Sequence, residues 1–255
     1  MWEKVKAEGG DGSLAIATKA LAWLLCAVRP LSPEEITQAI AVELGSTHMY
    51  PVEHIIATCG NFVSLDRKQN VLRFEHYSVQ EFLNQHEFKE AGPDIARSCF
   101  AVLSLLEPPP DLYRYVARYW QEHARSWKDT ADLSDPIERF LFDKSSLRSW
   151  TRYQISTAPY QSSWLKYLKL EPIHLVCHFE LVTILRYFFR RQLQNLGTPQ
   201  VLSEALALAA GNGCIEAVEF LLSEYPQVDL ERIGMFWSSW FGPPKQRKNV
   251  NKRFF

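Results

Sequence analysis

In the first part of the chain, apolar residues recur at the spacing of a helix, and this pattern predicts three helices. Apolar residues recur every three or four positions from Leu14 to Val28, and Arg29-Pro30 ends that run. A second helix is predicted after Ser32, because Ser32-Pro33-Glu34-Glu35 is a capping box. A third is predicted from Pro51 to Cys59, with Gly60 placed for a left-handed cap.

The spacing of apolar residues then changes from helical to alternating. Residues 62–65 and 71–74 are patterned as two short strands around the polar turn 66–70. A second capping box, Ser78-Val79-Gln80-Glu81, predicts a further helix. Three helices followed by a two-stranded hairpin is the element order of a winged helix, which we predict for residues 1–90.

The following region, residues 91–166, is patterned as helices separated by prolines. One apolar stretch covers 96–106, and Pro108-Pro109-Pro110 stops it. An apolar stripe starting at Tyr113 follows, and another helix is predicted from Pro136. We therefore expect a helical connector here, and a mainly α-helical protein as a whole.

Two similar segments lie 33 residues apart towards the C-terminus. EPIHLVCHFELVTILRYFF begins at Glu171, and EALALAAGNGCIEAVEFLL begins at Glu204. In each, a helix with small residues precedes an apolar helix. This order and this period are typical of ankyrin repeats, so we predict a short stack of two repeats within residues 167–230.

Two consequences follow from a stack this short. Each repeat buries its apolar face only against a neighbour, so the first repeat must dock on the connector. The side chains expected there are Trp150, Tyr153, Trp164 and Leu168. In addition, Glu180 stands where the second repeat has Gly213, and a positive φ at this turn would strain Glu180 by about 1 kcal/mol.

Composition and motifs argue against most kinds of chemistry. The net charge is −1, with 47% hydrophobic and 22% charged residues, so no global field favours nucleic acid or membranes. The five cysteines are widely spaced and form no Cys-x-x-Cys pair. No phosphate-binding Gly-x-x-x-x-Gly-Lys-Ser/Thr loop and no Gly-x-Ser-x-Gly elbow is present. We expect a cytoplasmic, non-enzymatic protein that needs no cofactor and no metal.

Three tracts carry a resemblance to a known family. ALAWLLCAVRPLSPEEITQAI (20–40) and FVSLDRKQNVLRFEHYSVQEFL (62–83) resemble the winged helix after the NACHT nucleotide-binding domain of fungal STAND signalling proteins, also called the GPI inositol-deacylase winged helix. LYRYVARYWQEHARSW (112–127) is similar to the helical section that precedes the ankyrin repeats in those proteins.

The resemblance implies a signalling switch, in which the winged helix helps to hold a closed state and the ankyrin repeats sense a protein partner. A NACHT domain, in cis or in trans, would be a second partner. ATP hydrolysis and deacylation do not carry over, because both motifs are missing. The chain would then be the regulatory half, or a truncated paralogue, of such a protein. The candidate binding residues on the concave side of the stack are Glu171, His178, Phe179, Glu204, Gly211 and Asn212.

Two other functions were weighed. A winged helix that binds nucleic acid needs Arg or Lys on its third helix, but Pro51–Cys59 has neither and the hairpin turn offers only Arg67 and Lys68, so we expect no nucleic-acid partner. A metal-dependent enzyme could use His174, Cys177 and His178, whose spacing suits one helical face. The simpler interpretation is that His174 is the structural histidine of the ankyrin motif.

The end of the chain, residues 231–255, has a composition of its own. MFWSSWF (235–241) is aromatic, and KQRKNVNKRFF (245–255) is basic without an acidic residue. We expect a poorly ordered tail. The alternatives are an anchor for an anionic membrane, the only membrane contact we consider, or a short import signal.

Overall fold

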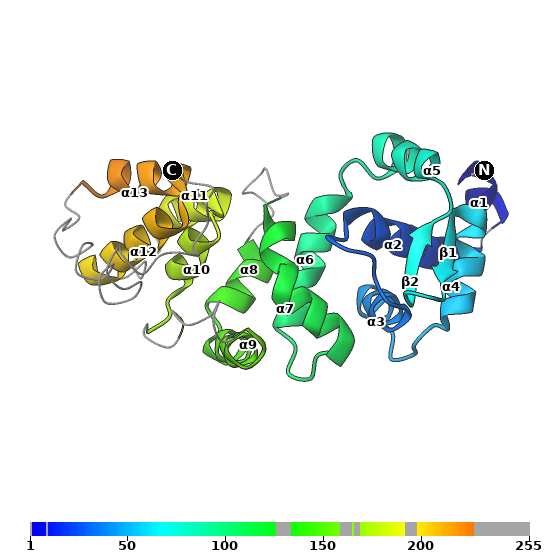
Figure 1. Ribbon diagram of the computed structural model, residues 1–255, viewed down its shortest axis with the longest axis horizontal. Helices are drawn as coiled ribbons and strands as arrows, with labels where there is room; N and C mark the ends of the chain where they lie inside the picture. Colours follow the sequence, from blue (N-terminus) through cyan, green and yellow to red (C-terminus); the bar gives the residue numbers. More distant parts are fainter. Residues whose placement is uncertain are drawn as a thin grey trace. The chain divides into compact units, whose positions relative to one another are not determined.

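A computed structural model describes residues 2–8, 10–125, 134–158, 165, 169–191 and 198–226. It is mainly helical, as predicted, and has one small sheet in these residues (Figure 1). The chain divides into two compact units, Met1–Trp127 and Lys128–Phe255, so the predicted connector is split between them. Within the described ranges, no helix has the length and apolar character needed to cross a lipid bilayer.

The first unit contains the predicted winged helix. Its elements are α1 (Trp2–Glu8), α2 (Asp11–Cys26), α3 (Pro33–Glu43), α4 (Val52–Thr58), the short turn η1 (Gly60–Phe62), and the strands β1 (Val63–Asp66) and β2 (Val71–Phe74). The strands pair antiparallel, with Val63 opposite Phe74. The Leu72 N–H also donates to the Leu31 carbonyl (2.9 Å), which ties the hairpin to the connection between α2 and α3.

Local sequence signals account for most of these boundaries. The Ser32 hydroxyl accepts from the Glu35 N–H (3.2 Å), and the Glu35 carboxylate accepts from the Ser32 N–H (2.9 Å), so the first capping box is confirmed. Gly60 has a φ of 63°, which confirms its left-handed conformation. The second box is wrong: α5 (Tyr77–Phe82) starts with His76 at the N-cap, so Ser78 falls inside the first turn and caps nothing.

Two further helices complete the core of the first unit. After α5 come the π-helix η2 (Leu83–Glu87), α6 (Ala91–Leu103) and α7 (Pro110–Ala124); α6 ends before the triple proline, as predicted, and Pro110 occupies the first turn of α7. α7 packs on both α6 and α3. At the second contact the Gln38 side chain donates to Asp111 (3.0 Å) and accepts from the Leu112 N–H (2.8 Å). The largest fully buried side chains of this unit include Trp23, Ile36, Ile55, Phe100, Tyr115 and Trp120.

The first helix is held to the π-helix by a single carboxylate. Trp2 Nε1 donates to Glu87 Oε2 (2.9 Å), and Lys6 Nζ lies 3.0 Å from the same oxygen. The indole of Trp2 also packs against the rings of Phe62 and Phe88. This short helix is therefore part of the first unit rather than a free end.

The second unit is built from helical hairpins. They are α8 (Ser134–Leu141) with α9 (Lys144–Thr157), α10 (Pro172–His178) with α11 (Val182–Arg190), and α12 (Pro199–Asn212) with α13 (Ile215–Glu224). α10 lies beside α12, and α11 lies beside α13 (Figure 1). Every residue from Leu202 to Ala209 is buried, and all of them except Glu204 are small or apolar.

The pair α8 and α9 supplies a neighbour for the hairpin α10–α11. Trp150 meets Phe179 edge-on at 6.4 Å, which confirms the docking contact predicted for Trp150. Phe142 meets Phe188 in the same way at 5.3 Å. The Tyr187 hydroxyl donates to Glu138 (2.6 Å). Trp164, Leu168 and the tail 231–255 lie outside the described residues.

Candidate protein-interaction site

The two C-terminal hairpins share one hydrogen-bond pattern with an offset of 33 residues. The Leu181 N–H donates to the Val176 carbonyl (2.9 Å), and the Cys214 N–H donates to the Ala209 carbonyl (2.9 Å). Both bonds close the turn after the first helix of a hairpin, as in a Schellman motif. The sequence echo therefore corresponds to a repeated backbone geometry.

The left-handed residue of each turn occupies the equivalent position. Glu180 has a φ of 55° and Gly213 a φ of 72°. Glycine adopts this conformation freely, whereas a residue with a Cβ is strained by about 1 kcal/mol or more. The left-handed backbone conformation on which the predicted strain of Glu180 depends is thus confirmed.

A buried histidine connects the first hairpin to the second. The Glu171 N–H donates to Nδ1 of His174 (3.1 Å), so the neutral ring carries its proton on Nε2. Nε2 lies 3.4 Å from Oε2 of Glu204, although not in line for a hydrogen bond. Burial opposes ionisation of Glu204, but its contacts with His174 and Gln200 outweigh burial and lower its pKa. His174 and Glu204 thus form an internal link of the stack.

A second polar contact lies where the turns of the two hairpins meet. The Asn212 side-chain nitrogen donates to the Leu208 carbonyl (2.8 Å) and lies 2.8 Å from Nδ1 of His178. An amide nitrogen only donates, so Nδ1 of His178 accepts. Burial lowers the pKa of His178 to about 4, which keeps the ring neutral at physiological pH. The ring of Phe179 stands edge-on to that of His178, at 4.7 Å.

The six candidate binding residues lie in different surroundings in the structure. His178, Phe179 and Asn212 come together at the turns, while Glu171 and Gly211 are partly exposed at the helix ends. Glu204 differs from expectation, because it is only 7% exposed and its carboxylate also accepts from Gln200 (2.9 Å). A glutamate that starts a repeat suggested a surface position, and the sequence carried no signal of its contact with His174.

The same geometry bears on the metal alternative. His174 and His178 contact different partners, Glu204 and Asn212 respectively, rather than converging on one point. Burial holds the pKa of the Cys177 thiol far above its usual range, which disfavours the thiolate that binds metals. In the part of the chain that the structure describes, no group of three or more His, Cys, Asp or Glu side chains could hold a metal ion.

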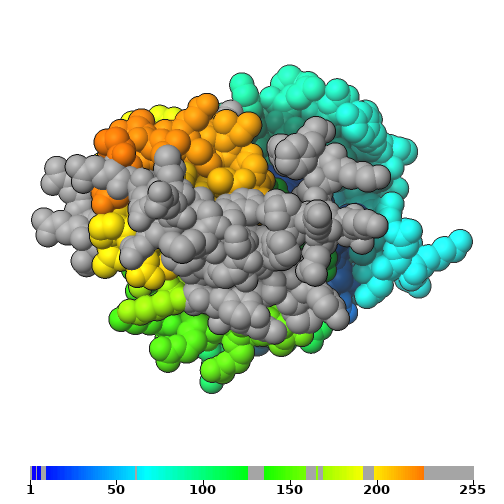
Figure 2. Space-filling model, turned by 60° about the vertical axis from the view of Figure 1, so that its left-hand side comes forward, coloured from blue at the N-terminus to red at the C-terminus, as the bar shows by residue number. Residues whose placement is uncertain are grey.

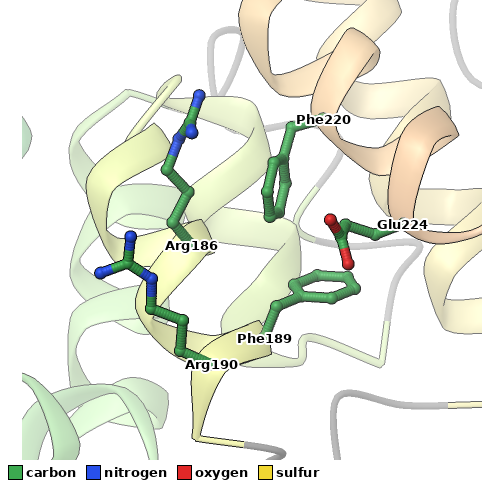
Figure 3. Close-up of a pocket in the computed structure, with 5 residues that line it drawn as sticks. All are labelled: Arg186, Phe189, Arg190, Phe220 and Glu224. Atoms are coloured by element: carbon green, nitrogen blue, oxygen red, sulfur yellow. The ribbon is translucent and has the colours of Figure 1, made fainter.

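A hollow that no sequence motif indicated lies between α11 and α13. Arg186, Phe189 and Arg190 of α11 and Phe220 and Glu224 of α13 line a pocket of about 310 Å³ (Figure 3). The rings of Phe189 and Phe220 meet edge-on at 5.2 Å. The arginines extend from one side of the rings and Glu224 lies on the other. A signal existed in the sequence, because α11 has no acidic residue and α13 no basic one, but it required knowing that these helices are neighbours.

Comparison with known families identifies the first part of the chain. Residues 7–96 match the model of the family described as GPI inositol-deacylase, winged helix domain. The match begins in α1 and ends inside α6, and it includes the three helices and the hairpin of the winged helix. Comparisons with curated proteins and with solved structures gave no match. The chain therefore contains a winged-helix domain of this type.

Proposed function

We propose that this chain is a non-enzymatic module for protein–protein interaction and regulation. In this proposal the hairpins α10–α13 are two ankyrin repeats whose concave side binds a protein partner. The winged helix has the regulatory part it plays after a NACHT domain in fungal STAND signalling proteins. The proposal includes a cytoplasmic location and a NACHT domain, in cis or in trans, as a further partner.

The observation that carries the proposal is the offset of 33 residues, shared by sequence and backbone. The starts of α11 and α13 at Val182 and Ile215, the left-handed turn residues Glu180 and Gly213, and the closing hydrogen bonds all repeat with it. Helix pairs with this period are the building blocks of ankyrin stacks, which bind through an extended surface rather than a reactive pocket. His174 of Glu-Pro-Ile-His stands where ankyrin repeats carry the histidine of Thr-Pro-Leu-His. The second segment departs from that motif, because it has Ala207 there.

The length of the stack is also consistent with the proposal. About three stacked units are needed for stability, and α8–α9 covers the side of α10–α11 through Trp150 and Phe142. The hairpin α10–α11 in turn covers one side of α12. The residues available to a partner are then those at the turns, His178, Phe179 and Asn212.

Affinity capture with a matched pair of variants tests the proposal. Full-length wild-type protein and the variants Asn212→Arg and Asn84→Arg are immobilised and exposed to extract from the native cells. Both asparagines are exposed, but only Asn212 belongs to the candidate surface. We expect the wild type and Asn84→Arg to retain the same protein, and Asn212→Arg to lose it while melting within a few degrees of the wild type. Identical capture by all three would refute the concave surface. Turnover of nucleotide or lipid ester by the purified chain would refute a non-enzymatic role.

A further inference from the structure

The outer sides of α11 and α13 are sorted by charge. α11 presents arginines and α13 presents glutamates, and the edge-on ring pair lies between the arginines and Glu224 (Figure 3). We call this surface the outer strip. Its residues are Arg186, Arg190, Phe189, Phe220, Glu216 and Glu224.

The outer strip is accessible and its charges are preorganised. The side chains of Arg186 and Glu216 are 48% and 63% exposed and lie 3.3 Å apart. The Arg186 guanidinium also sits over the Phe220 ring, 5.3 Å from its centre. Residues of α13 reach the molecular surface, coloured orange in Figure 2. The strip thus combines two aromatic rings with arginines and glutamates, a composition that suits a small protein interface.

The charge pattern determines which partner fits. A complementary surface must bring acidic groups to α11, basic groups to α13 and apolar groups to the ring pair. The strip itself has this composition. If a second copy is related by a two-fold axis running along the strip between the helices, α11 of one copy faces α13 of the other.

We propose that the outer strip is a self-association surface and that its occupant is a second copy of this chain. The axis preserves the level of each residue along the strip. Arg186 therefore meets Glu216 of the partner subunit, Arg190 meets Glu224 of the partner subunit, and the two ring pairs meet in the middle. The two-fold axis repeats every contact, so each ion pair contributes twice to the free energy of association. This surface shares no residue with the proposed concave surface, and either proposal can fail without the other.

Sedimentation velocity of the full-length chain over a concentration series tests this inference. We expect the weight-average sedimentation coefficient to rise with concentration. The rise should diminish in 1 M salt, where charges are screened within about 3 Å. R186E/R190E and E216K/E224K should each associate at least about tenfold more weakly, because four exposed attractions become repulsions. An equimolar mixture of the two variants should recover association, since each strip now complements the other.

Two controls make the result specific. R114E/R118E reverses two exposed arginines at the same spacing on α7 and should associate like the wild type. R186E/E216R exchanges the charges at positions 186 and 216 within each strip. The strip then remains complementary to a second copy of itself, so this variant should also associate. If a reversal variant loses its native circular dichroism, R186Q/R190Q replaces it, with a smaller loss expected.

Three results would overturn the inference. The first is a wild type that stays monomeric throughout the series. The second is a folded R186E/R190E that associates as the wild type does. The third is a mixture of folded complementary variants that remains monomeric.

Discussion

Glu180 and Gly213 hold the same left-handed backbone conformation at equivalent turns, with φ values of 55° and 72°. We expect Glu180→Gly to raise the free energy of unfolding by about 1 kcal/mol, because it removes the Cβ from a strained position. Gly213→Ala should lower it by about 1 kcal/mol, since it introduces that strain. Urea denaturation of the full chain measures both. A Glu180→Gly variant less stable than the wild type would contradict the common geometry of the turns.

The buried contact between His174 and Glu204 should contribute to the stability of the stack. His174→Ala leaves the Glu171 N–H and the Glu204 carboxylate without this partner, and we expect a loss of about 2 kcal/mol. Glu204→Gln should cost about 1 kcal/mol, because the amide keeps an acceptor but loses the charge. Glu219→Gln on the exposed side of α13 is the control and should be neutral.

The contribution of Glu204 should also depend on pH. Its pKa in the folded protein lies below the ordinary value of 4.5, so between the two values the unfolded chain binds a proton that the folded protein has released. The stabilisation is therefore complete above pH 4.5 and is lost as the pH falls through the folded pKa. The stability difference between the wild type and Glu204→Gln should shrink in that range. A difference that stays constant from pH 7 to pH 3 would exclude this linkage.

His123 should make the first unit sensitive to acid. The Tyr115 hydroxyl accepts from the Val28 N–H (3.0 Å) and forms a second hydrogen bond with Nε2 of His123, at 2.9 Å. Burial lowers the pKa of His123 from 6.5 to about 4. Between these values only the unfolded chain binds the proton, so stability should fall as pH decreases from 6.5 towards 4. The slope is about 1.4 kcal/mol per pH unit.

A substitution isolates this effect. His123→Phe cannot bind a proton, so its stability should vary less with pH than that of the wild type between 4 and 6.5. His86→Phe is the control, because His86 is exposed on η2, and it should keep the dependence of the wild type. Thermal melts at half-unit steps of pH compare the three proteins. Equal slopes in the wild type and His123→Phe would show that another group is responsible.

The boundary of the family match should not be a folding boundary. The match ends at residue 96, inside α6, whereas the compact unit continues to Trp127. A fragment 1–127 should unfold cooperatively. A fragment 1–96 lacks the buried Phe100, Tyr115 and Trp120, and the loss of even one such ring costs about 3–5 kcal/mol, comparable with the whole stability of a small domain. Circular dichroism melts distinguish the two, and a cooperative transition for 1–96 would contradict the shared core.

Local signals were predictable from the sequence because they depend on neighbouring residues alone. The capping box at Ser32, the left-handed Gly60 and the hairpin around the turn 66–70 are of this kind. The capping box predicted at Ser78 was wrong although it has the same residue pattern. The N-cap of the helix is His76, two residues before Ser78.

Long-range relationships were predictable only where the sequence repeats. The repeat revealed that Glu180 corresponds to Gly213, and the position of the docking surface at Trp150 followed from the length of the stack. Periodicity showed that α6 and α7 have buried faces, but not that Phe100 and Trp120 pack together, at 5.5 Å, in the core of the winged-helix unit. For the same reason the contact between His174 and Glu204 and the charge-sorted outer strip became visible only when the helices were placed side by side.

The contacts of the Glu87 carboxylate with Trp2 and Lys6 affect how the unit would respond to force. One carboxylate and two aromatic neighbours hold α1, whereas α2 and α7 are anchored in the interior of the unit. Tension applied at the first residue would load these few contacts first. The chain would then yield at α1, and the force would pass to η2 through Glu87 and to the start of the hairpin through Phe62.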